Sequence, residues 1–429
     1  MFGFANFLLL ALFAAAVFDL IFALARGGGL RGALHGPWNT PHLLFGQQLA
    51  EWRLQLGRIL FAAGLAAYEI SVVFCNSMAR QNWAWVQGVM SPVLEWLAFL
   101  CFGAKILFGT RYTWRELLAG GALYFIARWV YFNSQNIWWI GIVVAVLAAK
   151  DVPLRRTLQV YFASGCAAMA VVLALHFAGI VAPDLTSERM GALRGTYGYG
   201  HPNTFGGLVF GLVLAYALLR AQKVRWVDCL LVFAVGVFLL VGPASRSAAL
   251  CTLALAVGLV FCRLRAGHSV PRWWPGTCAG MVGLTAAVSY LLPLLVIKVG
   301  PWNNDIGPAW LAKLDSLLTC RISLTWMAYR LLDVKIAGQV FNWPTVDNSF
   351  AFALFQFGPV VAALLGILFA AALLGHAKQG RRVEVCCLFA MLAYAYMEVQ
   401  PFHLTTNPTA LLLCGAVFAQ TSARWQKIE

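Results

Sequence analysis

Charged side chains are scarce in this sequence. Of its 429 residues, 11% are charged and 61% are hydrophobic, whereas an ordinary soluble domain has roughly 25% charged residues. The composition therefore excludes a soluble globular domain. Runs of about 20 apolar residues recur from one end of the sequence to the other, and a helix of that length crosses a bilayer. We expect an all-α polytopic membrane protein in which residues 1–429 form a single integral membrane domain.

Two further absences narrow the fold and its chemistry. The apolar runs lack the alternation of apolar and polar residues that transmembrane strands require, so a membrane β-barrel is excluded. The 11 cysteines lie mostly inside apolar runs, as Cys386 and Cys387 do, and show neither a disulfide framework nor metal-ligand spacing. We expect neither a metal nor any other cofactor.

Basic residues outnumber acidic ones, and the net charge is +15. Nucleic acid is not the expected partner, because Arg and Lys gather in short loops on alternate sides of the apolar runs. Roughly 21 of the 31 basic residues fall on one side. This positive-inside pattern predicts that the basic side faces the cytoplasm. The expected partner is therefore the lipid bilayer.

The apolar runs predict about 12 to 13 transmembrane helices. The first, residues 2–25, is read as a membrane helix, and residues 43–56 are expected to form an amphipathic helix on the membrane surface. The further spans fall near residues 59–76, 89–109, 116–134, 137–150, 157–181, 202–219, 226–243, 247–262, 276–297, 347–373, 383–399 and 408–422.

One loop on the outer side, residues 298–346, is too long for a simple connection. Within it, residues 308–333 have a helix-like pattern, and the apolar stripe consists of Trp310, Leu314, Leu317 and Leu318. We expect this loop to form an extracytoplasmic lid that packs on the membrane domain.

Similar motifs stand where outer helices begin. Each places small polar side chains at the first turn of a span: His201-Pro202-Asn203, Ser245-Arg246-Ser247, Asp347-Asn348-Ser349 and Thr406-Asn407-Pro408. If these helices are neighbours, the positive ends of several helix dipoles converge on one outer site that suits an anion. The alternative interpretation is plain helix capping.

Arginines accompany these motifs. A guanidinium group matches phosphate oxygens with two parallel hydrogen bonds, so the arginines favour a phosphate or pyrophosphate ligand. No outer loop carries an Asp-x-Asp metal motif. The competing interpretation is that these arginines are solvated or snorkelling charges. The candidate anion ligands are Arg194, Arg246, Arg321 and Arg330.

The same region carries a set of motifs in a fixed order from about residue 190 to 410, half of the sequence. The motifs are Tyr199-Gly200-His201-Pro202-Asn203, Ser245-Arg246-Ser247, Leu318-Thr319-Cys320-Arg321-Ile322-Ser323-Leu324, Gly338, Val346-Asp347-Asn348-Ser349-Phe350 and Phe357-Gly358. This set resembles the Wzy-type polysaccharide polymerases, which form one membrane glycosyltransferase superfamily with the O-antigen ligases. Cys320 departs from the pattern, since related chains are expected to have glycine before the arginine.

The resemblance implies a GT-C-like, metal-independent glycosyltransferase in a bacterial plasma membrane, with its active site on the extracytoplasmic side. Its donor and acceptor would be glycans on undecaprenyl pyrophosphate, and its product a surface polysaccharide such as O-antigen, capsule or exopolysaccharide. A chain-length regulator and a flippase are possible further partners. Nucleic acid is not one.

Roles follow from this chemistry. The arginines would bind the pyrophosphate and stabilise the leaving group, and a base would take the acceptor proton. The base candidates are His201, Asp347 and His403, and His201 is favoured because a histidine can ionise near neutral pH. The residues expected to orient substrate are Tyr199, Asn203, Asn348 and Glu398, the last of which follows an apolar span.

Two other functions stay open. A ligase would use the same chemistry on another acceptor, and cells lacking it would make polymer of normal length that is not attached. An anionic-lipid flippase or transporter would need charges through the membrane depth or broken helices in corresponding halves.

Overall fold

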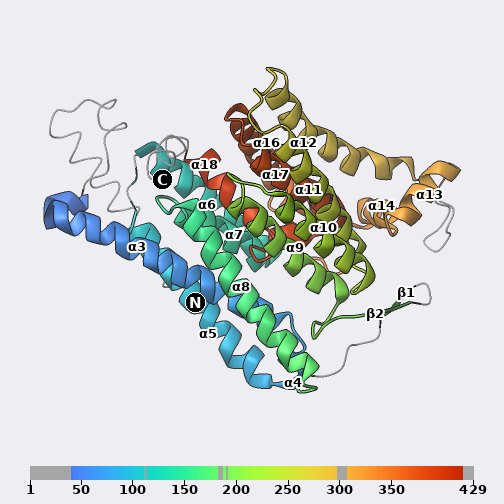
Figure 1. The fold of residues 1–429 in the computed structure, drawn as a ribbon, viewed down its shortest axis with the longest axis horizontal. Helices are drawn as coiled ribbons and strands as arrows, with labels where there is room; N and C mark the ends of the chain where they lie inside the picture. Colours follow the sequence, from blue (N-terminus) through green and yellow to red (C-terminus); the bar gives the residue numbers. More distant parts are fainter. Residues whose placement is uncertain are drawn as a thin grey trace.

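The computed structural model describes residues 40–110, 112, 114–181, 187–189, 192–296 and 307–418 (Figure 1). The described chain is helical apart from one antiparallel hairpin, in which β1 (Ser187–Arg189) pairs with β2 (Ala192–Arg194). Seven of its helices are long and apolar enough to cross a membrane. The expected all-helical, polytopic architecture is confirmed at this level. The predicted first span, residues 2–25, lies outside the described residues.

Most predicted spans coincide with helices. Apolar runs bounded by turn residues set both ends of each helix, and α9 has the predicted bounds. These helices are α5 (Ser91–Phe108) preceded by the π-helical η1 (Val86–Met90), α6 (Trp114–Ser134), α7 (Ile137–Ala148), α8 (Leu154–Phe177), α9 (Pro202–Leu219), α10 (Trp226–Val241), α11 (Arg246–Leu264), α12 (Trp274–Leu291) continued by η2 (Leu292–Leu295), and α17 (Arg382–Met397).

The helix α3 (Thr40–Cys75) corrects the prediction of a separate surface helix over residues 43–56. That segment and the following span form one continuous helix of 36 residues. Its membrane-crossing part runs from Trp52 to Cys75. The helix α3 is not interrupted, because residues 43–75 include neither proline nor a pair of adjacent glycines.

Two predicted spans are not single helices. Residues 347–373 divide into α15 (Ser349–Phe352), the π-helical η3 (Ala353–Phe357) and α16 (Pro359–Lys378), with a break at Gly358, whose φ is +87°. Residues 408–422 begin as a 3-10 helix, η5 (Pro408–Leu413), followed by α18 (Cys414–Val417). Every residue from Leu404 to Cys414 is buried, so this irregular backbone lies inside protein rather than against lipid.

The described part of the long loop contains two helices, α13 (Ala309–Leu317) and α14 (Arg321–Leu331), instead of one. They are separated at Thr319 and Cys320, which both have positive φ. The predicted apolar stripe is wrong for Trp310 and Leu317, which are 55% and 70% exposed. Leu314 and Leu318 do pack inward, around buried Leu311 and Ile322.

The membrane helices pack in two groups that meet at α8 and α9 (Figure 1). In the first group α3 lies between α5 and α8. In the second, α11 contacts α9, α10 and α17, and α12 and α17 both contact α16. The main core is formed by buried side chains of both groups. The helices α13 and α14 stand beside the end of α12.

The two ends of the bundle differ in charge. At one end, which we name the basic end, α9 and α11 finish and α10 and α17 begin, and the exposed basic residues include Lys223, Arg225, Arg263 and Arg265. Arg382, also at this end, donates to the carbonyl oxygens of Arg265 and His268, so it joins two loops as well as adding charge. At the opposite end, which we name the site end, α9, α11, α14 and α15 begin.

Candidate functional site

Glu398 is the centre of a buried polar cluster at the site end. It directly follows α17 and is 4% exposed. Its Oε1 accepts hydrogen bonds from Arg321 Nη2 at 2.6 Å, Ser247 Oγ at 2.8 Å and Asn203 Nδ2 at 3.1 Å. These donors belong to the first turns of α14, α11 and α9. The contacts therefore bring together helix starts that the sequence predicted to converge.

Arg321 forms an ion pair with Glu398 inside the protein. Nε donates to the carbonyl oxygen of Met397, and Nη1 donates to the carbonyl oxygen of Leu318 at 2.9 Å. Each guanidinium nitrogen thus meets a protein acceptor, and Arg321 is only 7% exposed. The sequence predicted a ligand-facing arginine, whereas the structure gives this side chain an internal partner that cancels its charge.

Asp315 holds the helix that carries Arg321, and the sequence reasoning did not identify it. Its carboxylate is fully buried, and Oδ1 accepts from the backbone N–H groups of Ile322 at 2.8 Å and Ser323 at 3.1 Å. Cys320, at the N-cap position, makes no side-chain cap. Asp315 therefore caps α14 from the preceding helix. Its signal in the sequence was a lone carboxylate six residues before the arginine.

Asn203 extends the cluster to the hairpin. While its Nδ2 donates to Glu398, its Oδ1 accepts from Arg194 Nη2 at 2.9 Å. Arg194 Nη2 also reaches the carbonyl oxygen of Ala244 at 3.2 Å, just before α11. Because Arg194 is 5% exposed, it belongs to the framework of the site as Arg321 does. Two of the predicted anion ligands are thus linked through Asn203 and Glu398.

The start of α15 forms another side of the site. Asn348 is the N-cap, where its Oδ1 accepts from the backbone N–H groups of Phe350 and Ala351, and its Nδ2 donates to Ser289 Oγ at 3.1 Å. Ser349 Oγ donates to the carbonyl oxygen of Glu398. The capping interpretation therefore holds for Asn348, and the cap fixes the position of Asp347.

Asp347 is the partly exposed carboxylate beside this cluster. Burial raises the pKa of the Glu398 carboxyl, the Arg321 charge acts against that rise, and the negative charge of Asp347 adds to it. The two carboxylates are therefore close enough to interact. The site combines a buried, paired glutamate with an aspartate that solvent reaches.

His201 is exposed and caps α9. Its Nδ1 accepts from the backbone N–H of Asn203 at 3.1 Å. This hydrogen bond uses the ring lone pair, so the neutral ring carries its proton on Nε2. The arrangement favours the capping role over the role of general base that the sequence suggested.

His403 lies apart from the Glu398 cluster. Its ring packs on Trp138, with the ring centroids 3.9 Å apart. Burial lowers the pKa of His403 to about 4. A ring with this pKa is uncharged and weakly basic at neutral pH, which makes His403 a poor general base. No hydrogen bond among the described residues joins it to Glu398.

The remaining candidates occupy different positions. Tyr199 is fully buried and packs on Phe205, while its backbone pairs with Ser77 in the segment that follows α3. Arg246 is exposed on the first residue of α11, next to Ser247. Arg330 is also exposed, with its guanidinium 5.8 Å from the Trp326 ring centroid. Arg246 is therefore the predicted anion ligand that is both exposed and adjacent to the cluster.

The described residues contain no group of three His, Cys, Asp or Glu side chains placed to hold a metal ion. Comparisons with protein-family models, with curated proteins and with solved structures gave no significant match to this chain.

Proposed function

We propose that this protein is a membrane glycosyltransferase that polymerises oligosaccharide repeat units carried on undecaprenyl pyrophosphate into a surface polysaccharide. We place the reaction at the site end, on the extracytoplasmic face of a bacterial plasma membrane. Described residues 307–346 of the long loop, with α13 and α14, would act as its lid.

One observation carries the proposal. The motifs that resemble the polymerase family are far apart in the sequence, yet Asn203, Ser247, Arg321 and Ser349 all reach Glu398 directly. Asn203, Ser247 and Arg321 bind the Glu398 carboxylate, and Ser349 binds its backbone carbonyl oxygen. A set of motifs that served only to cap separate helices would have no reason to meet at one buried glutamate. Their convergence supports a common site.

The chemistry assigns the proton transfer to Asp347. In the proposed step, the acceptor hydroxyl oxygen forms a bond to the anomeric carbon of the donor while the bond from that carbon to the pyrophosphate oxygen breaks. The leaving pyrophosphate keeps the electron pair, and the hydroxyl proton passes to the Asp347 carboxylate. Asp347 fits this role better than His201 or His403, because it is partly exposed and its carboxylate serves no helix cap among the described contacts.

The leaving group needs positive charge and N–H donors. Arg246 supplies an exposed guanidinium at the start of α11, and the first turns of α9 and α11 add their helix dipoles. Preorganised donors of this kind are often worth roughly 3 kcal/mol each in the transition state. The hydrogen bonds that link Arg194, Asn203, Glu398 and Arg321 fix the positions of these helix starts relative to one another.

Purified protein incubated with lipid-linked repeat units provides the test. We expect a ladder of extended glycans on a gel, and we expect Asp347→Asn and Arg246→Ala to abolish it at matched protein levels. Lys378→Ala, on an exposed basic-end residue, is the matched control and should leave the ladder unchanged.

Other outcomes would point elsewhere. Transfer of a preformed glycan to a different acceptor without extension would indicate a ligase. Movement of the lipid between leaflets of a vesicle without new glycosidic bonds would indicate a flippase. Either result would refute the polymerase proposal.

A further inference from the structure

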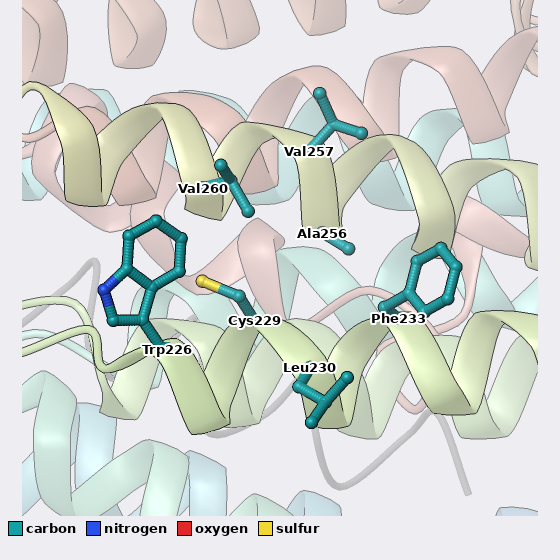
Figure 2. A pocket seen from close by; sticks show the side chains of 7 residues that line it. All are labelled: Trp226, Cys229, Leu230, Phe233, Ala256, Val257 and Val260. Atoms are coloured by element: carbon teal, nitrogen blue, oxygen red, sulfur yellow. The ribbon is translucent and has the colours of Figure 1, made fainter.

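An apolar groove runs along the outside of the bundle between α10 and α11, towards the basic end (Figure 2). Its cavity volume is about 330 Å³. The lining side chains are Trp226, Cys229, Leu230 and Phe233 of α10 and Ala256, Val257 and Val260 of α11. None of these lining residues belongs to the Glu398 cluster, and the proposed reaction makes no use of the groove.

The shape of the groove suits an extended hydrocarbon chain. Small side chains, Cys229 and Ala256, form a buried floor, whereas Trp226 and Phe233 stand at its two ends and are about half exposed. These two aromatic residues are seven positions apart on α10, which corresponds to about 10 Å along a helix. Val257 and Leu230 form exposed edges, at 70% and 66%.

Positive charge gathers at one end of the groove. Arg225 directly precedes Trp226 and is exposed, and Arg263, on the last turn of α11, is exposed as well. Arg263 lies close enough to the thiol of Cys229 to interact with it electrostatically. Lys223 and Arg265 add two further exposed charges in the adjoining loops.

We propose that this groove binds one phospholipid with an anionic headgroup. An acyl chain would lie over Cys229 and Ala256, and the phosphate would meet Arg225 and Arg263. An acyl chain already in the bilayer gains little from moving into an apolar groove, since lipid tails are as apolar as the lining. Selectivity must therefore come from the charges, and basic pockets beside membrane helices select anionic lipids.

Native mass spectrometry of the purified full chain tests the site, with phosphatidylglycerol and phosphatidylcholine of matched acyl chains as probes. We expect the wild-type protein to retain phosphatidylglycerol more tightly. Arg225→Gln and Arg263→Gln should each weaken this binding about fivefold. Val257→Trp should also weaken it, because the larger ring would occupy the exposed edge of the groove.

Two matched controls separate the groove from the general surface. Leu250→Trp changes another exposed, lipid-facing residue of α11, and Lys378→Gln removes an exposed basic-end charge on α16; both should leave binding unchanged. Equal retention of the two lipids by the wild type would overturn the proposal, as would full retention by the Val257→Trp and arginine variants. A protein dimer that Val257→Trp abolishes would assign the groove to a second copy of the chain instead.

Discussion

The buried pair of Arg321 and Glu398 is the residue-scale feature on which the site depends. Removing one partner of a buried ion pair leaves the other unpaired and typically costs about 3–5 kcal/mol. We expect Glu398→Ala to lower the thermal unfolding temperature strongly, since the buried Arg321 would lose its charged partner. Replacing both residues with leucine should restore much of that stability without restoring glycan extension.

Thermal unfolding in detergent, together with glycan extension, distinguishes the structural and functional roles of this pair. Normal glycan extension by the double leucine variant would show that the pair only stabilises the fold and that the reaction does not depend on the Glu398 cluster.

Asp315 gives a second residue-scale prediction. The cap it provides for α14 needs only an oxygen acceptor, which asparagine retains and alanine lacks. We expect Asp315→Ala to destabilise the protein by about 1–2 kcal/mol, a usual cost for losing an N-cap, and to reduce activity by misplacing Arg321. Asp315→Asn should retain most of both. Equal damage from the two substitutions, measured by unfolding and extension assays, would mean that the charge of Asp315 matters rather than its cap.

His403 makes stability depend on pH in a defined direction. Its pKa in the folded protein is about 4, below the ordinary value of 6.5, because burial disfavours the charged ring. Between these two pH values the unfolded chain binds the proton and the folded chain does not, so stability falls as pH decreases from 6.5 towards 4. We expect His403→Gln to remove part of the loss of unfolding temperature between pH 7.5 and pH 5. An unchanged pH profile would show that His403 is not shielded as described.

At the scale of elements, the sequence predicted most helices well because long apolar runs and polar helix starts are local signals. The breaks were missed for a physical reason. Thr319 and Cys320 take positive φ where local backbone hydrogen bonds to Ser316 and Asp315 close the end of α13, and neither threonine nor cysteine signals such a turn. Gly358 takes positive φ where its backbone passes close to Ile336. Chains of the family that the sequence resembles are expected to have glycine at position 320. Glycine suits the left-handed backbone that Cys320 adopts.

For the candidate site, too, the sequence predicted some features and missed others. Helix starts with polar residues were visible in the sequence, and so was the expectation that they converge. The pairing of Arg321 with Glu398 was not visible, since a side chain's partner 77 residues away depends on how the helices pack. The capping roles of His201 and Asn348 were open alternatives that only the hydrogen bonds resolve.

The segment after α14 contacts the break before α16 at Gly338 and Gln339, and this contact gives the element-scale prediction. Gly338 has φ +74°, and a Cβ there would stand 2.1 Å from the carbonyl oxygen of Gln356. Gly267 is the matched control, because it has φ +83° and nothing within 4 Å of its Cβ position. Gly267→Ala should cost only about 1 kcal/mol for the left-handed backbone. Gly338→Ala should lower the free energy of unfolding by more than this and should also reduce glycan extension. Unfolding and the glycan ladder measure the two effects. Equal losses of stability in the two variants would mean that the segment after α14 is not anchored at Gly338.

For the molecule as a whole, the proposed function requires one orientation in the membrane. The positive-inside rule predicts from the exposed basic residues that the basic end lies in the cytoplasm and that the site end faces outwards. Cys320, between α13 and α14, reports on this directly. All 11 cysteines lie in the described residues, and Cys320 alone among them is exposed.

We therefore expect a membrane-impermeant maleimide to label the wild-type protein in intact spheroplasts and to leave Cys320→Ser unlabelled. In the Cys320→Ser background, Lys223→Cys places a thiol in the exposed loop between α9 and α10 at the basic end, and it should react only after the membrane is permeabilised. Cys320 lies at the site end and residue 223 at the basic end of the bundle, so their labelling must be reciprocal. Labelling of Cys320 only after permeabilisation would invert the topology. It would place the Glu398 cluster on the cytoplasmic side, where a surface polysaccharide is not assembled from exported repeat units, and the proposed function would fall with it.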